Sequence, residues 1–475
     1  MNLPYDAQKE HRWRFRFVER RILLLIGDII AALLALVIAL FVWGNQAEFL
    51  GFSVRFILER VPNWFFVMPV IWVLLLSEAY DIRKSGNWRD TFQSIATAAV
   101  IGTVLYLIVY FTSTPESLPR IGVAVFIIAA ALTTLAWRYF YIRVLTAPQF
   151  LRRVLLIGGG VSGNVLLESF NALESKPFNL VGIIDDDPRK QDIEIAGYPV
   201  LGRGQDLLEV IRRENISDVI VAITGVINGG TFQSILDAQE LGVDVNRMPV
   251  IYEELNQRVP IRILEADWIL RSFVDDTSVS SFYHLMKRIL DILGGLVGFG
   301  IFLLMLPLVG FLIFIDDGFP ILYRQVRLGR SGQEYKIIKF RTMKKDAEKD
   351  GEAKWASEDD QRITKIGRIL RKTHLDEFPQ FYNVLRGEMS LVGPRSERPS
   401  LVNKLQEQVP FYRARLLVKP GVTGWAQINY GYPETIEGTI DKLEYDLFYI
   451  KNRNILLDLR IIFRTPATIF GLKGK

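Results

Sequence analysis

Two adjacent carboxylates, Asp376 and Glu377, lie in the stretch RILRKTHLDEFPQFYNVLRGEMSLVGPR, which begins at Arg368. Three cations, Arg368, Arg371 and Lys372, closely precede them. A carboxylate is a weak nucleophile but a good leaving group, so it can divide one difficult displacement into two easier ones. Neighbouring cations would neutralise a negatively charged substrate. Taken alone, the same residues also fit the solvated end of a helix.

Four arginines in this region could supply the neutralisation. One ends a basic hairpin upstream, one lies just before the carboxylates, and two follow the motif LVGP. Arginine makes bidentate, charge-assisted hydrogen bonds to phosphate, so these side chains are candidate phosphate-binding groups. They are Arg341, Arg371, Arg395 and Arg398.

The two carboxylates are also candidate ligands for a metal ion. Mg²⁺ prefers oxygen ligands and commonly shares the phosphate oxygens of a substrate. Asp376 and Glu377 cannot point in the same direction from a regular helix, and Pro379 disfavours helical conformation at Phe378. A helix end at this point would allow the two carboxylates to lie around one metal ion.

A basic hairpin is expected to position this region. In ILYRQVRLGRSGQEYKIIKFRTM the turn is predicted at RSG, between two strands. The strands carry Arg324, Arg327, Lys336, Lys339 and Arg341. The segment that follows, KKDAEKDGEAKWASEDD, has the composition of a loop.

The composition fits a membrane protein that carries soluble domains. Of 475 residues, 50% are hydrophobic, yet 23% are charged. The chain contains no cysteine, which excludes disulfides, thiolate nucleophiles and Cys-zinc sites. Its three histidines are far apart in sequence, so a histidine metal cluster is not expected.

Four apolar segments occupy the first third of the chain: residues 22–43, 64–79, 92–111 and 121–142. Each has about the ~20 residues needed to cross a bilayer. Lys and Arg are concentrated in the N-terminal tail (residues 1–21), after the second segment and after the fourth. The positive-inside rule then predicts four transmembrane helices within residues 22–145, with both ends in the cytoplasm. A buried core helix is the alternative for any single segment.

A further apolar run extends from Ile289 to about Ile315, with Lys287 and Arg288 before it and Arg324 after it. Basic residues on both sides favour two cytoplasmic ends. Pro307 lies inside the run, where it removes a backbone hydrogen bond and bends a helix. We therefore expect a re-entrant membrane helix over residues 288–318 that breaks at Pro307. The alternative is a fifth, kinked span.

Residues 151–276 are predicted to form an α/β Rossmann-like domain. The segment VLLIGGGVSGNVLLESF reads as a buried strand, a glycine turn and a helix, and Gly158, Gly160 and Gly163 fit G-x-G-x-x-G. The turn could bind a nucleotide phosphate, or the glycines could simply allow close packing. Tyr198 and Tyr252, the tyrosines of this segment, are not followed by the lysine of a Tyr-x-x-x-Lys pair.

The C-terminal motifs resemble those of the bacterial sugar transferases, monotopic polyprenyl-phosphate phosphoglycosyl transferases. The resemblance rests on KFRTM, DQRITKIGRILRKTHLDEFPQFYNVLRGEMSLVGPRSERP and VKPGVTGWAQINYGY, in this order within residues 282–475. The preceding spans and CoA-binding-like domain are similar to the long-form members, and the tail is similar to the exopolysaccharide branch. The implied fold is a multidomain membrane protein with a four-helix transmembrane bundle, a Rossmann-like domain and an α+β catalytic domain with a re-entrant helix.

The resemblance implies transfer of a sugar-1-phosphate from a UDP-sugar to undecaprenyl phosphate with release of UMP. This is the first step of exopolysaccharide or O-antigen synthesis, on the cytoplasmic face of the bacterial inner membrane. Asp376 would form a covalent phosphosugar intermediate, and Mg²⁺ would bridge the pyrophosphate and the carboxylates of Asp376 and Glu377. Besides these substrates and the lipid bilayer, the Rossmann-like domain could be a homodimer contact. No nucleic-acid partner is expected.

Three departures from the family pattern are visible. Phe378 replaces a leucine, Ser396 replaces a proline, and INYGY replaces INGR. The last of these changes leaves the identity of the sugar as the least determined property.

Two other functions are alternatives. A membrane-anchored nucleotide-sugar epimerase or dehydratase would need the missing Tyr-x-x-x-Lys pair, and a non-catalytic assembly scaffold would not need the Asp-Glu pair.

Overall fold

The structure, a computed structural model, describes residues 14–46, 51–81, 85–112, 119–147, 150–263, 280–345, 360–431 and 435–469. The chain divides into two compact units, Met1–Ile251 and Tyr252–Lys475. The domain boundary expected at residue 276 and the loop expected after residue 345 lie outside the described residues.

The first unit begins with long apolar helices. They are α2 (Phe17–Gln46), α6 (Trp88–Thr112) and α7 (Arg120–Phe140), and α7 continues into a π-helical turn, Tyr141–Leu145. With α13 of the second unit, four described helices are long and apolar enough to cross a membrane. The chain is therefore a membrane protein with several apolar helices.

The segment expected to be the second span is not one straight helix. It consists of η1 (Asn63–Val67), α4 (Met68–Leu75) and η2 (Leu76–Tyr80), preceded by α3 (Val54–Arg60). The chain bends by 104° between α3 and the η1–α4 segment. Val61 is extended because Pro62 follows it, and this ends α3. Counted as one broken span, this bent pair would be a fifth crossing.

A buried ion pair joins α2 to α7. Arg138 Nη2 lies 2.6 Å from Asp28 Oδ2, and Arg138 Nη1 donates to the carbonyl of Ala79 at 2.7 Å. Both charged side chains are fully buried. An apolar setting tolerates such charges only when they are paired in this way, so the pair fixes the register of the two helices.

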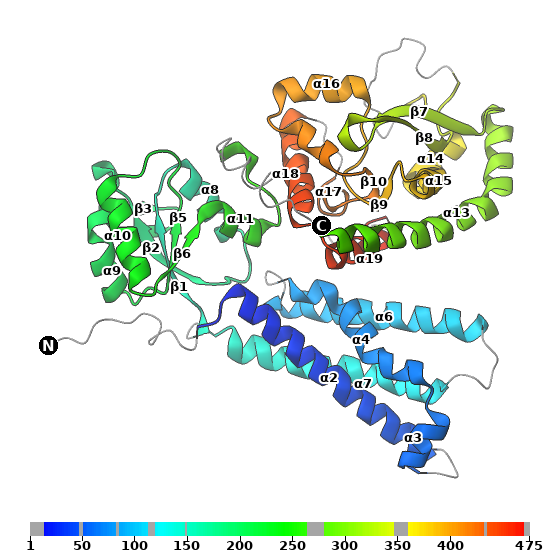
Figure 1. The fold of residues 1–475 in the computed structure, drawn as a ribbon, viewed down its shortest axis with the longest axis horizontal. Coiled ribbons are helices and arrows are strands. Elements are labelled where there is room, and N and C mark those ends of the chain that lie inside the picture. Colours follow the sequence, from blue (N-terminus) through cyan, green and yellow to red (C-terminus); the bar gives the residue numbers. More distant parts are fainter. Residues whose placement is uncertain are drawn as a thin grey trace. The chain divides into compact units, whose positions relative to one another are not determined.

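The Rossmann-like part of the first unit is a six-stranded sheet in the order β3-β4-β2-β1-β5-β6 (Figure 1). The strands are β1 (Arg153–Ile157), β2 (Asn179–Ile184), β3 (Glu194–Ile195), β4 (Tyr198–Gly202), β5 (Asp218–Val221) and β6 (Asp244–Arg247). All pairings are parallel except that of β3 with β4. Helix α8 (Val161–Asn171) covers one face, and α9 (Leu207–Arg213) and α10 (Gly229–Glu240) cover the other. The predicted strands and glycine turn are confirmed.

Helix α11 (Met248–Asn256) leads into the second unit, whose described part is α+β. It contains the hairpin β7 (Leu322–Leu328) and β8 (Glu334–Phe340), and a parallel pair of β9 (Ser390–Val392) and β10 (Gly421–Thr423). Its helices are α13 (Ser281–Asp317), α14 (Lys365–Lys372), α15 (Phe381–Arg386), α16 (Pro399–Gln408), α17 (Trp425–Asn429), α18 (Ile436–Asn452) and α19 (Ile455–Ile469). Trp425, Leu447 and Ile450 are at the centre of its core.

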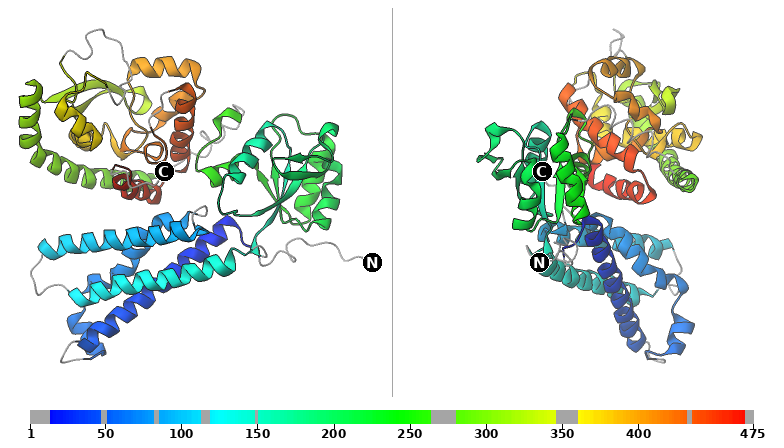
Figure 2. Two further views of the ribbon diagram at one scale, coloured as in Figure 1. Left: turned by 180° about the vertical axis from the view of Figure 1, so that it is seen from behind. Right: turned by 60° about the vertical axis from the view of Figure 1, so that its left-hand side comes forward.

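Helix α13 lies along this unit with one side against it. Gly294, Gly295 and Gly298 face Leu391, Leu385 and Phe381, where an added Cβ would meet those side chains at 2.9 Å or less. The opposite side is apolar and exposed. The helix is continuous through Pro307, and its ribbon bends part-way along its length (Figures 1 and 2). A lost backbone hydrogen bond at a proline is the ordinary cause of such a bend.

Candidate active site

One face of the β7–β8 hairpin forms a wall of a cavity of about 460 Å³. The antiparallel register places Tyr323 opposite Lys339 and Gln325 opposite Ile337. Alternate residues of a strand share a face, so these side chains project to the same side. The predicted turn at RSG is confirmed, since η9 (Arg330–Gly332) connects the two strands.

Asp376 lies on a short 3-10 helix, η10 (Leu375–Gln380), that faces this hairpin. Helix α14 ends before it because His374 adopts a left-handed conformation, with φ of 54°. The Asp376 side chain lines the cavity although the residue is only 7% exposed. Within the described part of the chain, no hydrogen bond or ion pair reaches its carboxylate. A buried, unpaired carboxylate is costly, which makes Asp376 unusual here.

Glu377, its sequence neighbour, is in the opposite situation. Lys339 Nζ donates to Glu377 Oε1 at 2.8 Å, and Arg395 Nη2 donates to the same oxygen at 2.7 Å. Burial alone would raise the pKa of Glu377, but Arg395 and Lys339 together hold it well below its usual range. Glu377 is therefore ionised and paired, whereas Asp376 faces the cavity.

Burial raises the pKa of the Asp376 carboxyl group, and the negative charge of Glu377 raises it further. Lys339, Arg395 and His374 act in the opposite direction. Asp376 thus lines the cavity, whereas Glu377 accepts hydrogen bonds from Lys339 and Arg395. The expected arrangement of both carboxylates around one metal ion remains a prediction. In this structure Glu377 instead accepts hydrogen bonds from two cations.

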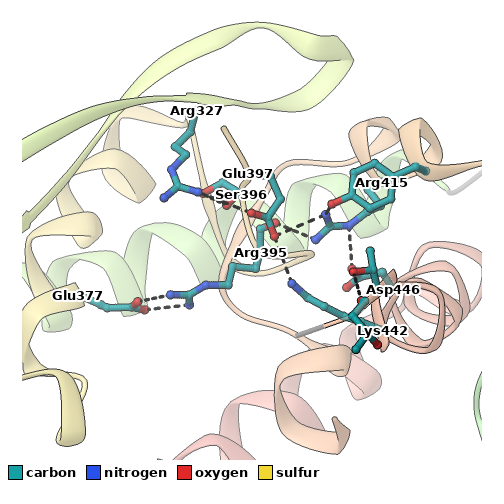
Figure 3. A network of polar contacts seen from close by, with 11 residues as sticks. Arg327, Glu377, Arg395, Ser396, Glu397, Arg415, Lys442 and Asp446 are labelled. Carbon is teal, nitrogen blue, oxygen red and sulfur yellow. Dashed lines mark hydrogen bonds and ion pairs between the residues drawn. The ribbon is translucent and has the colours of Figure 1, made fainter. Parts of the chain in front are cut away.

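A network of charged residues holds Arg395 in place (Figure 3). Arg415 Nη2 donates to the carbonyl of Arg395 at 2.9 Å, and Arg415 Nε donates to Asp446 Oδ2 at 2.8 Å. Arg327 Nη1 donates to the carbonyl of Ser396 at 3.0 Å. The adjacent Glu397 forms ion pairs with Lys442, Arg327 and Arg415. The turn that contains Ser396 in place of proline is thus held by side chains.

The other predicted phosphate-binding arginines, Arg341, Arg371 and Arg398, all line the Asp376 cavity. Arg341 Nη2 donates to the carbonyls of Asp317 and Gly318 at the end of α13, at 2.8 and 2.6 Å. Its Nε and Nη1 atoms are buried and have no hydrogen-bond partner among the residues that the structure describes. Unsatisfied buried donors of a cation are costly, and a substrate phosphate would satisfy them. Arg395 does not line the cavity, but it contacts Glu377.

Sequence reasoning did not include Lys339, Arg327, Tyr323 or Gln325 in the site. Their signal is the period of two along the basic hairpin, which assigns alternate residues to one face. The sequence alone does not show which face of the hairpin meets Asp376, because this depends on how η10 packs against β8.

The glycines of the Rossmann-like domain have partly structural roles. A Cβ at Gly163 would lie 2.1 Å from the carbonyl oxygen of Gly158, and Gly158 has a φ of +99°. Gly160 has open space around it. Asp185 Oδ2 accepts a hydrogen bond from the backbone N–H of Gly159 at 2.8 Å. Nucleotide binding at this turn remains a prediction.

The oxygen donors of the cavity are those expected for Mg²⁺ only if a substrate adds to them. Asp376 provides one carboxylate, and the described residues contain no group of three His, Asp or Glu that could hold a metal ion. Mg²⁺ is commonly bound by one or two carboxylates together with substrate phosphates. The donor set therefore fits a metal shared with a phosphate substrate and held by Asp376.

A buried carboxylate in a cavity lined by arginines has the chemistry to bind a phosphate group. The profile of the bacterial sugar transferase family matches residues 282–471, and that of a CoA-binding domain matches residues 75–225. The chain belongs to the bacterial sugar transferase family.

Three relatives illustrate this membership. The UDP-glucose:undecaprenyl-phosphate glucose-1-phosphate transferase of Escherichia coli (strain K12) is 32% identical over 66% of this chain and 67% of its own. The UDP-galactose-lipid carrier transferase of Erwinia amylovora is 29% identical over 68% and 69%. The UDP-N-acetylgalactosamine-undecaprenyl-phosphate N-acetylgalactosaminephosphotransferase of Aeromonas hydrophila is 36% identical over 48% of this chain and about half (52%) of its own length.

Proposed function

We propose that this protein transfers a sugar-1-phosphate from a UDP-sugar to undecaprenyl phosphate and releases UMP. One observation carries the proposal: among the described residues nothing pairs with the Asp376 carboxylate, which lies in an arginine-lined cavity, whereas the adjacent Glu377 is neutralised by Lys339 and Arg395. Of these two carboxylates, Asp376 is thus the one available to attack a phosphate. The names of the relatives support the substrates.

The reaction has two displacements at the same phosphorus atom. First, a carboxylate oxygen of Asp376 attacks the β-phosphorus, a new O–P bond forms, and the bond to the α-phosphate oxygen breaks as UMP leaves. Second, a phosphate oxygen of undecaprenyl phosphate attacks that phosphorus, and the bond to Asp376 breaks. The product is the sugar linked to the lipid through a pyrophosphate, and the carboxylate is restored.

The cations in and next to the cavity have distinct parts in this scheme. The free donors of Arg341, together with Arg371 and Arg398, would stabilise the charge on the pyrophosphate and on departing UMP. Lys339 and Arg395 hold the Glu377 carboxylate away from the cavity and lower the cost of ionising Asp376. Mg²⁺, when bound, would add charge neutralisation at the pyrophosphate beside Asp376.

A re-entrant placement of α13, with the catalytic unit at the cytoplasmic face of the inner membrane, is part of the proposal. Near the start of α13, Lys287 Nζ donates to the carbonyl of Val392 at 3.0 Å, and at its end Arg341 binds the carbonyls of Asp317 and Gly318. Val392 and Arg341 belong to the same compact unit. A helix that crossed the bilayer would separate its two ends by about 30 Å of hydrocarbon. These contacts therefore support an entry and exit on one side.

The test is UMP release from a panel of UDP-glucose, UDP-galactose and UDP-N-acetylgalactosamine, with the full-length protein in nanodiscs and undecaprenyl phosphate. We expect one sugar to be preferred and UMP to appear in proportion to lipid-linked product. Asp376→Asn should abolish both product and covalent labelling from a β-³²P-labelled UDP-sugar, because an amide cannot form the acyl phosphate. More than a few per cent of wild-type activity in this variant would exclude the covalent role. A non-catalytic scaffold would release no UMP with any sugar.

A further inference from the structure

A second cavity, of about 730 Å³, lies in the same unit and shares no lining residue with the Asp376 cavity. Its walls come from the N-terminal turns of α13, the β7–β8 turn, the segment before β10 and the end of α18. Five lysine or arginine side chains line it, against one carboxylate, that of Asp291. The cavity is therefore strongly basic.

Two of the five cations, Lys287 and Arg288, have partners on other elements, whereas Arg453 Nη1 donates to the carbonyl of Ile450, three residues before it, at 2.6 Å. Lys287 Nζ lies 3.0 Å from Asp458 Oδ2. Arg288 donates to two carbonyl groups at the end of α15, at 3.0 and 2.9 Å. Asp291 is also engaged, since its Oδ1 accepts two hydrogen bonds from β9. Lys287, Arg288 and Asp291 are therefore all paired within the protein. They do not balance the positive charge of the remaining cations that line the cavity.

The other three cations are Arg330, Lys419 and Arg453. Among the residues that the structure describes, none of them has a carboxylate within ion-pair distance. Burial lowers the pKa of Lys419, and Arg288 and Arg330 lower it further. Burial likewise lowers the pKa of Arg453, and Arg330 contributes to that decrease. Like charges held together without a counter-ion destabilise one another, and a bound anion would relieve this repulsion.

An apolar surface begins at the same place. The N-terminal turns of α13 form one wall of the cavity, and the outer side of that helix is exposed and apolar. The exposed residues are Phe282, Leu285, Ile289, Leu293, Leu296 and Val297. A molecule with a phosphate group and a hydrocarbon chain could bind with its phosphate in the cavity and its chain along α13.

We propose that this cavity is a second phosphate-binding site, separate from the Asp376 site, that Arg330, Lys419 and Arg453 form for a phosphate group at the membrane surface. That group would come from the headgroup of an anionic bilayer lipid or from a soluble polyphosphate. Both present the same chemistry, a multiply hydrogen-bonding anion that three cations can bind. The proposal goes beyond the transfer reaction and does not depend on it.

The experiment compares the full-length protein with Arg330→Gln/Lys419→Gln, in detergent. Native mass spectrometry would measure retention of phosphatidylglycerol against phosphatidylcholine, and thermal unfolding would be recorded with and without millimolar pyrophosphate. The double variant lacks two cations that could make charge-assisted hydrogen bonds to the phosphate group, so it should lose at least tenfold in affinity. The matched control is Lys404→Gln/Arg413→Gln, which removes two exposed cations that do not line the cavity.

The lipid-retention and pyrophosphate measurements distinguish the two sources of the phosphate group. Preferential retention of phosphatidylglycerol that only the Arg330/Lys419 variant loses identifies a lipid headgroup. Stabilisation by pyrophosphate that only this variant loses, without lipid preference, identifies a soluble anion. If the Arg330/Lys419 variant and the control keep both lipid retention and pyrophosphate stabilisation at the wild-type level, the proposal is wrong. UMP release does not enter either readout, so failure of the proposed transfer reaction would be seen separately.

Discussion

Glu377 and Arg395 form an ion pair across the second unit, with 2.7 Å between Oε1 and Nη2, and Lys339 donates to the same oxygen. The pair connects the 3-10 helix that carries Asp376 and Glu377 to a turn that Arg327 and Arg415 hold (Figure 3). Glu377 therefore acts as an anchor that fixes the direction of its neighbour Asp376. Its loss should affect stability as well as activity.

We expect Glu377→Gln to destabilise the protein by roughly 1–3 kcal/mol, because it leaves two partly buried cations without a counter-charge. Thermal unfolding in detergent measures this, with exposed Glu334→Gln as the control. The pKa of Glu377 is depressed in the folded state. The stability that the ionised Glu377 contributes is therefore fully present above its unfolded pKa of ~4.3, and it is lost as the pH falls below that value toward the folded-state pKa. The difference between variant and wild type should therefore be constant from about pH 6 to 8. An unchanged melting temperature would contradict the anchoring role.

The acidic limb of the pH–rate profile should depend on Lys339. In the proposed reaction the attacking form of Asp376 is the carboxylate, so covalent labelling should fall as the pH decreases through its raised pKa. Lys339 lowers that pKa, and Lys339→Met should therefore move the acidic limb to higher pH. Labelling rates from about pH 4 to 8 would show the shift. Lys404→Met, on an exposed face of α16, should leave the profile in place. Identical profiles for all three proteins would show that Lys339 does not tune Asp376.

Arg371 and Arg368 form a matched pair on α14, because Arg371 lines the cavity whereas Arg368 is exposed elsewhere on the helix. A charged hydrogen bond to the pyrophosphate contributes about 1.5–3 kcal/mol, so Arg371→Gln should lower kcat/KM for the UDP-sugar roughly 10- to 100-fold. Arg368→Gln should change it less than twofold. Equal effects of the two substitutions would mean that general positive charge, rather than a specific contact, is responsible.

The motif order identified the Asp376–Glu377 pair and the arginines, because these signals are local in sequence. The contacts of Glu377 were not predictable in the same way, since Lys339 is 38 residues and Arg395 18 residues away along the chain. Hydropathy likewise identified the apolar segment at residues 64–79 but not its geometry. There, the prolines at positions 62 and 69 interrupt backbone hydrogen bonding that hydropathy does not measure. Local chemistry could be predicted from sequence, and long-range packing could not.

A fragment that begins at residue 252 should be more stable than one that begins at residue 280. Residues 257–261 pack on the catalytic unit: Trp425 Nε1 donates to the carbonyl of Gln257 at 2.9 Å, and Val259 N–H donates to the carbonyl of Glu444 at 3.1 Å. Val259 and Ile261 are buried in its core, and each contributes roughly 1.5–3 kcal/mol. Melting temperatures of the two purified fragments test this. In the full-length chain, Val259→Ala should destabilise the protein, whereas the exposed Ile436→Ala should not.

The topology of α13 can be tested with single cysteines, because the chain has none of its own. His284, in the first turns of α13, and Arg330, beyond its end, line the same cavity, so both should be on the cytoplasmic side. We expect His284→Cys and Arg330→Cys to react with a membrane-impermeant thiol reagent only after spheroplasts are lysed. Phe52→Cys, an exposed position between α2 and α3, should react in intact spheroplasts and is the positive control. Labelling of position 330 but not 284 in intact cells would mean that α13 spans the membrane. Pro307→Leu should favour that spanning state, because it restores the missing backbone hydrogen bond and straightens the helix.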